Sequence, residues 1–238
     1  PYKTFRWPIS GLYRRKNYMN RVQKAVKKLA PGLVIGHGDI VQQDICYIHN
    51  CVHLAYEVIN GKKIPHDHEV AKIHEDILRS QLFKVLVCNS EMMKRDLMAR
   101  FNIPEEKIEI LYPMYNSEKF HIDAGNRDKV RDELNIPSDQ VVIGFITSGN
   151  FKKRNLSLLI EASAKLKGNF KILVAGKDKK DKYQKRIDEL NLGDKIEFVP
   201  SIDSVEDYYA ASDVFCLPAH IEEFGLSIME AMACGRPA

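Results

Sequence analysis

The chain has 238 residues, of which 45% are hydrophobic and 29% are charged, and its formal net charge is +4. This composition is typical of a globular protein with one large or two modest domains. The chain contains neither a targeting segment nor an apolar run of about 18 residues, so we expect no signal peptide and no membrane span.

The five cysteines are an odd number at unrelated spacings, and most lie inside apolar runs. We therefore expect reduced core thiols in a cytoplasmic protein. The pair Cys46 and Cys51 lacks the further ligands of a zinc site, so no metal is predicted there.

The amino-terminal segment is basic, because residues 1–38 contain nine Lys and Arg residues, Lys3 and Arg6 among them, and no acid. Within residues 14–29 the apolar side chains recur at helical spacing, which predicts a basic amphipathic helix. Such a helix either packs on its own domain or contacts an anionic membrane surface or a phosphorylated acceptor. Nucleic acid is not expected, since no binding motif accompanies the charge.

Two short strands are predicted next, over residues 33–36 and 45–49, and polar residues follow each of them. The carboxyl ends of parallel strands line the ligand crevice of an open sheet. The candidates for an acceptor side are therefore His37, Asp39, His49 and Asn50, although a histidine that caps a strand for structural reasons fits equally well.

Residues 66–83 have one apolar stripe at helical spacing, and the three histidines here do not share a helical face. A solvated helix is therefore favoured over a metal site for His66, His68 and His74. A buried strand over 84–89, a helix capped by Ser90 and a strand over 107–111 complete this domain. We place the domain boundary between residues 115 and 116.

The second domain is predicted to open with a helix over 127–134 and a strand over 141–147. The turn that follows combines Gly149 with the cations Lys152, Lys153 and Arg154 in front of a helix. Glycine allows close backbone approach and cations neutralise phosphate charge, so this turn is a candidate phosphate site. An ordinary basic helix start is disfavoured, because cations there oppose the helix dipole.

Further strands are predicted over 171–175, 196–199 and 213–217, each followed by a polar loop and alternating with helices. Lys177, after the first of them, is another candidate phosphate contact. This alternation is typical of a parallel, doubly wound α/β sheet. No G-x-G-x-x-G stands at a strand-to-helix turn, which argues against a dinucleotide dehydrogenase.

The final stretch predicts a helix over about 224–234 that is buried on all sides and stops at Gly235. Glu230 lies inside this helix and Glu222 in the loop before it. Between them, free N–H groups near Gly225 and Leu226 form an anion site. Such an arrangement suits a sugar, a pyrophosphate and a ribose; a plain structural helix whose Glu230 pairs with a Lys or Arg is the alternative.

The pair Glu222-x7-Glu230, within EEFGLSIMEAMACGRP, closely resembles the signature of family 4 glycosyltransferases, which are retaining enzymes of the two-domain GT-B fold. The resemblance implies that Glu222 lies beside the donor sugar and that Glu230 binds the ribose hydroxyls. It also implies that the backbone of Phe224, Gly225 and Leu226 meets the diphosphate.

Other positions follow the family less closely. Asn150 stands where the family has an arginine, while Arg154 matches its lysine, and Lys152 or Lys153 could replace the missing cation. The backbone at Val199 is expected to meet the base. His49 with Asn50 resembles the family's pair near the reacting sugar, so His49 joins Glu222 as a predicted catalytic residue.

We therefore expect two Rossmann-like domains of the GT-B type, lacking the start of the first and the end of the second. The predicted activity is transfer of a hexose from a nucleoside diphosphate sugar to a saccharide or lipid-linked acceptor in cell-envelope glycan synthesis, without metal or cofactor. The looser resemblance of residues 31–115 is to enzymes of lipopolysaccharide cores. A nucleotide-sugar epimerase and a non-catalytic binding fragment are the alternatives, and the expected location is cytoplasmic, peripheral to the membrane if the basic helix binds there.

Overall fold

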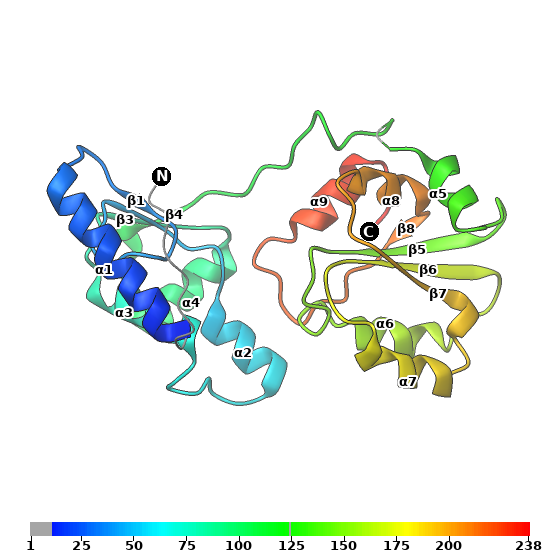
Figure 1. Ribbon diagram of the computed structural model, residues 1–238, viewed down its shortest axis with the longest axis horizontal. Helices are drawn as coiled ribbons and strands as arrows, with labels where there is room; N and C mark the ends of the chain where they lie inside the picture. The colour runs from blue at the N-terminus through cyan, green and yellow to red at the C-terminus, as the bar shows by residue number, and fades with distance from the viewer. Residues whose placement is uncertain (1–10, 124) are drawn as a thin grey trace. The chain divides into compact units, whose positions relative to one another are not determined.

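The computed structural model describes residues 11–123 and 125–238, and the chain divides into two compact units between Pro113 and Met114 (Figure 1). This division lies two residues from the predicted boundary. Lys3 and Arg6, which belong to the basic amino-terminal segment, lie outside the described residues. Each unit is a parallel α/β sheet with helices, as predicted.

In the first unit the order of elements is α1 (Gly11–Leu29), β1 (Ile35–Gly36), β2 (Ile45–Tyr47), α2 (Val52–Asn60), α3 (Glu69–Ser80), β3 (Val85–Cys88), α4 (Glu91–Phe101), a 3-10 turn (Glu105–Lys107) and β4 (Ile108–Ile110). The four strands pair in sequence order and all run parallel. Their carboxyl ends therefore meet at one edge, which places the residues after β1 and β2 near each other.

Local capping explains where these helices begin and end. The Ser90 hydroxyl accepts a hydrogen bond from the Met93 N–H at 3.3 Å, as the sequence predicted, and Asn102 ends α4 with a left-handed φ of 52°. Helix α2 was not predicted. It has no side-chain cap at its start, and only Gly61, with φ of 64°, marks its end.

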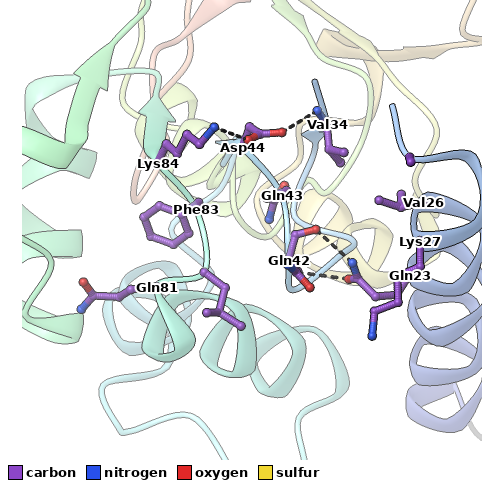
Figure 2. A pocket seen from close by; sticks show the side chains of 12 residues that line it. Gln23, Val26, Lys27, Val34, Gln42, Gln43, Asp44, Gln81, Phe83 and Lys84 are labelled. Atoms are coloured by element: carbon purple, nitrogen blue, oxygen red, sulfur yellow. Dashed lines mark hydrogen bonds and ion pairs between the residues drawn. The ribbon is translucent and has the colours of Figure 1, made fainter. Parts of the chain in front are cut away.

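A cavity of about 540 Å³ lies at the amino edge of this sheet, between the end of α1 and the residues that precede β2 and β3 (Figure 2). Gln23 exchanges two 3.2 Å hydrogen bonds with the main chain of Gln42. Asp44 accepts from the Val34 N–H at 2.9 Å and pairs with Lys84 at 2.8 Å. These contacts tie α1 to the strand starts, while the candidate histidines lie at the opposite edge.

His74, on α3, is a partly buried titratable group of the first unit. A Cβ added at Gly38 would lie 3.4 Å from its Nε2, so the loop after β1 closes over the ring. Burial, and then the charges of the neighbouring His53 and Arg15, lower the pKa of His74 to about 4. His74 is therefore neutral in the folded chain at neutral pH.

We expect the first unit to lose stability as the pH falls from 7 towards 4. The unfolded chain protonates His74 near pH 6.5 and the folded chain only near 4, so the unfolded state binds more protons in that window. The cost attributable to His74 is roughly 2–3 kcal/mol. Hydrogen exchange of the α3 amides, measured between pH 4 and 7, reports the stability of this unit. His74→Gln should reduce the pH dependence of that stability, whereas the exposed control His66→Gln should not. Equal pH profiles for wild type and His74→Gln would contradict this account.

In the second unit the order is α5 (Arg127–Glu133), β5 (Val141–Ile146), α6 (Leu156–Ser163), β6 (Phe170–Ala175), α7 (Asp181–Glu189), a 3-10 turn (Gly193–Lys195), β7 (Ile196–Val199), α8 (Val205–Ala211), β8 (Val214–Phe215) and α9 (Leu226–Ala233). The strands are parallel in the order β7-β6-β5-β8. Helix α8 begins later than the predicted Ser201 or Asp203.

The second unit has three layers. Helices α6 and α7 cover one face of the sheet, and α5, α8 and α9 cover the other (Figure 1). Side chains alternate accordingly: Phe145 and Val174 belong to the core under α6 and α7, while Ile146 and Leu173 belong to the opposite core. Buried on both faces, such strands are continuous apolar runs, which is why they could be predicted.

Asp213 holds β8 in place beside β5. Its carboxylate accepts a hydrogen bond from the Val142 N–H at 2.7 Å and pairs with Arg127 at 2.6 Å and Arg131 at 3.4 Å. Burial alone would raise the pKa of Asp213, but these bonds and the two arginine charges together outweigh burial and lower the pKa. The strand that leads into the Glu222 loop is thereby fixed to the sheet.

The basic helix α1 extends beyond its predicted start at residue 14. Met19 is buried against the unit, but Tyr18 and Leu29 are 44% and 66% exposed. Among the described residues, no helix is both long and apolar enough to cross a membrane. The five cysteines, all of them described, form no disulfide.

Candidate functional site

A cavity of about 420 Å³ lies at the carboxyl edge of the second unit's sheet. Loops that follow each of its strands contribute to the lining, as expected for a ligand crevice in an open parallel sheet. The structure brings together, around this cavity, five of the residues predicted for the donor site: Arg154, Lys177, Glu222, Leu226 and Glu230.

Gly225 sets the start of α9 at the cavity wall. Its φ of 83° is a left-handed conformation that favours glycine, and its carbonyl accepts the 2.9 Å hydrogen bond of the first helical turn from Ile228. The helix therefore starts at Leu226, two residues later than predicted. No side chain caps this start, and Leu226 and Ser227 line the cavity. The first turn thus presents N–H groups that favour an anion.

Arg154 and Glu222, which both line the cavity, form an ion pair with each other. The Nε of Arg154 is buried and has no hydrogen-bond partner. Burial lowers the pKa of the Arg154 guanidinium, and the Glu223 carboxylate opposes this effect. Arginine remains charged at neutral pH. The cavity lining therefore includes both a cation with an unused donor and a helix start whose N–H groups favour an anion.

Lys153 pairs with Glu223 at 2.5 Å and, unlike Arg154, does not line the cavity. Both side chains are almost buried, with 12% and 8% of their surface exposed. The Lys153 carbonyl also accepts a 3.0 Å hydrogen bond from the His220 N–H. Glu223 was missed in the sequence analysis, because the signature spacing to Glu230 selects its neighbour Glu222.

Gly149 and Asn150 shape the turn after β5 rather than line the cavity. Gly149 has φ of 142°, and a Cβ there would lie 3.4 Å from the Lys177 carbonyl. Asn150, with φ of 56°, accepts a 3.1 Å hydrogen bond from the Lys153 N–H. Asp178 accepts from the Phe151 N–H at 2.9 Å and joins this turn to the loop after β6.

Glu230 faces the cavity from α9, and the Tyr209 hydroxyl donates a 2.9 Å hydrogen bond to its Oε2. The hydrogen-bond partner of Glu230 is therefore a tyrosine on α8, not the Lys or Arg of the structural alternative. Burial raises the pKa of Glu230, while the Tyr209 bond and the charge of Lys119 oppose that rise. One carboxylate oxygen is thus fixed by Tyr209.

Helix α9 is not buried on all sides, contrary to the prediction. Met229 and Met232 are 39% and 58% exposed, and within α9 only Ala231 is fully buried. The apolar composition predicted burial, but the second unit covers only the side of α9 that faces Tyr209.

Lys119 was missed by the sequence analysis, although it lines the cavity. It donates to the Asp203 carbonyl and pairs with Glu206 at 3.3 Å, so it joins the segment before α5 to the loop before α8 and to the first turn of α8. Val199 and Phe224 do not line the cavity. The predicted contacts of their backbones remain predictions.

The remaining predicted catalytic residue, His49, belongs to the first unit. Its Nε2 lies 2.9 Å from Nδ1 of His37, and the Tyr47 ring stacks on it at 4.4 Å between centroids. Burial, and then the charge of His37, lower the pKa of His49. The structure thus brings together two of the four acceptor-side candidates at the carboxyl edge of that sheet.

Among residues 11–123 and 125–238, no group of three or more His, Cys, Asp or Glu side chains could hold a metal ion. His68 instead caps α3, where its Nδ1 accepts a 3.3 Å hydrogen bond from the Ala71 N–H.

A parallel α/β unit with a helix start, a cation and two carboxylates around one cavity defines a Rossmann-like ligand-binding domain. Residues 126–238 match the model of the family described as glycosyl transferases group 1, so this part of the chain is similar to that family. The resemblance found in the sequence is confirmed.

Two curated relatives of this chain are glycosyltransferases. The D-inositol 3-phosphate glycosyltransferase of Mycolicibacterium smegmatis is 30% identical over 161 residues, which cover 64% of this chain and 36% of that protein. An uncharacterised glycosyltransferase of Methanocaldococcus jannaschii is 28% identical over 155 residues, which cover 62% of this chain and 40% of that protein. The chain therefore spans less than half the length of these relatives.

Solved structures show the same fold. WaaG, a glycosyltransferase involved in lipopolysaccharide biosynthesis, matches with a TM-score of 0.81 and 21% identity, over all of this chain and 65% of that one. Sucrose-phosphate synthase from Thermosynechococcus elongatus matches with a TM-score of 0.74 and 18% identity, over 98% of this chain and 62% of that one. The predicted pair of Rossmann-like units of the GT-B type is thus confirmed.

Proposed function

We propose that this protein transfers a hexose, with retention of configuration, from a nucleoside diphosphate sugar to a saccharide or lipid-linked acceptor. The observation that carries the proposal is the cavity that Arg154 and the uncapped start of α9 line together with Glu222 and Glu230. A diphosphate suits the cation and the helix N–H groups. A sugar on one side and a ribose on the other would meet the two carboxylates.

The protein's own charges supply the chemistry in this proposal. Departure of a nucleoside diphosphate leaves negative charge on the phosphates, and preorganised positive groups stabilise it as it develops. Arg154 and the first turn of α9 are those groups. Glu222 orients the transferred sugar and Glu230 holds the ribose. Because these residues provide the positive charge, we expect activity to persist in the presence of a metal chelator.

UDP-glucose is the first donor to test. Among the structures of similar fold is HepE of Anabaena in complex with UDP-glucose, with a TM-score of 0.66 and 17% identity over 81% of this chain and 51% of that one. The acceptor is proposed to belong to cell-envelope glycans, as the fold match with WaaG suggests.

The test is incubation of the full-length protein with labelled UDP-, GDP- and ADP-sugars and a set of cell-envelope acceptors. Nuclear magnetic resonance of the product identifies the anomer. Transfer with retention supports the proposal. Formation of an epimer would identify an epimerase instead, and binding without turnover would identify a non-catalytic binding protein.

We also propose that α1 contacts an anionic membrane surface, which would place the protein at the inner, cytoplasmic face of a membrane. A groove on this helix combines the exposed Tyr18 and Leu29 with Arg21 and Lys24. Apolar side chains and cations on one exposed face suit a lipid interface. Lys16 contributes less, because it pairs with Asp76 at 3.5 Å.

The protein is expected to co-sediment with anionic vesicles at low salt and much less with neutral ones, because each cation near such a surface contributes about 1 kcal/mol and is screened by salt. Arg21→Glu with Lys24→Glu should abolish the difference. The control Lys62→Glu with Lys63→Glu makes the same charge change on the exposed loop after α2 and should retain it. Equal recovery with both vesicle types would remove the membrane proposal, and loss of acceptor affinity alone would indicate a phosphorylated acceptor.

A further inference from the structure

Two consecutive cations on the loop between β5 and α6 meet two consecutive acids on the loop between β8 and α9. Lys153 pairs with Glu223, and Arg154 pairs with Glu222. The first pair lies outside the cavity lining and is almost completely shielded from solvent. The second pair belongs to the lining, where about one fifth of each side chain is exposed. The two pairs therefore differ in their access to a ligand.

Arg154 has more donors than its present partner uses. Its Nε is buried without an acceptor, which is an unfavourable state for a polar group inside a protein. An anion in the cavity would supply acceptors with more negative charge than one carboxylate. Glu222, in turn, would be freed from the guanidinium by such an anion.

We propose that Glu222 and the donor diphosphate compete for Arg154, and that Arg154 changes partner when the donor binds. This inference rests on the proposed donor site. It means that the carboxylate becomes available to the transferred sugar only when a diphosphate is in place. Glu222 thereby ties the positioning of the sugar to occupation of the phosphate site.

The Lys153–Glu223 pair allows this exchange without movement of the loop. It joins the same two loops one residue away, and the hydrogen bond from the His220 N–H to the Lys153 carbonyl reinforces it. Breaking a buried pair on one side is strongly destabilising, so this contact persists when Arg154 moves. Lys153 and Glu223 are therefore positioning residues rather than ligands of the diphosphate.

The test is the affinity for UDP, and for inorganic pyrophosphate as a probe without a base, measured by nuclear magnetic resonance titration at concentrations up to the millimolar range. Glu222→Gln should raise both affinities about fivefold, because it removes a competing carboxylate. A damaged fold would lower them. Glu161→Gln, which removes the same charge from an exposed pair with Arg186, should leave both affinities unchanged.

The same substitution in the Arg154→Ala background separates competition from simple repulsion between Glu222 and the phosphates. Competition predicts that the gain disappears with Arg154. Persistence of the gain in that background, or no gain in the wild-type background, would overturn the exchange but leave the donor site intact. Failure of the wild-type protein to bind either probe would instead overturn the donor site itself.

Discussion

Replacing Arg154 by Ala is expected to reduce the affinity for UDP on the order of a hundredfold while the affinity for uridine changes little. A hydrogen bond between charged groups contributes about 1.5–3 kcal/mol, and 1.4 kcal/mol corresponds to a factor of ten. Arg154 is the arginine that lines the cavity, and its loss would also leave Glu222 unpaired beside the phosphates. Titration calorimetry with the two ligands measures the difference.

Lys152→Ala is the matched control. Lys152 lies two residues before Arg154 and carries the same charge, but its side chain does not line the cavity. This substitution should leave both affinities within a factor of about three, the range of a solvent-exposed charge. Equal losses for UDP and uridine in Arg154→Ala would indicate a folding defect, and a larger loss in Lys152→Ala would place the phosphates elsewhere.

Helix ends could be predicted from the sequence where a single residue determines the local backbone conformation. Ser90 caps α4 and Gly235, with φ of 72°, ends α9, as predicted, because such positions have few competing conformations. The strands of the second unit could also be predicted, because strands that are buried on both faces are continuous apolar runs. Helix α2 has neither signal at its start and was missed.

The site could be predicted only in part, because pairing between distant loops has no local signal. Arg154 and Glu222 were both identified, but the sequence did not show that they pair with each other. Lys153 and Arg154 are neighbours of the same charge, and only the fold separates the buried Lys153–Glu223 pair from the cavity. Lys119 was missed because it precedes the domain's first helix and carries no motif.

The exposure of Met229 and Met232 was not predicted either, because it too depends on contacts between distant parts of the chain. Composition reports that a helix face is apolar, but it does not report which part of the chain covers that face. In the second unit, α9 packs through Ala231 and Cys234 onto the core that contains Tyr209, and its outer methionines remain exposed. The burial of Glu230 beside the cavity follows from that same packing.

Replacing Glu230 by Gln is expected to weaken nucleotide binding roughly 10- to 100-fold while turnover at saturating donor stays nearly unchanged. Ribose hydroxyls that donate to a charged acceptor contribute about 1.5–3 kcal/mol, and such binding is made equally in the ground and transition states. The amide oxygen of Gln can still accept the bond from Tyr209, so the fold of α9 is preserved. Steady-state kinetics with the identified donor should show a raised KM and an unaltered kcat.

The pH dependence provides an independent check of this role. Burial raises the pKa of Glu230, so as the pH falls through that raised value the carboxylate gains a proton and the ribose loses its charged acceptor. Nucleotide affinity should therefore decrease towards acidic pH in the wild type, and Glu230→Gln should remove this dependence. Tyr209→Phe, which deletes only the hydroxyl that opposes the rise, should move the decrease to higher pH. If Glu230→Gln abolished turnover and left donor affinity intact, Glu230 would act on the transferred sugar and not on the ribose.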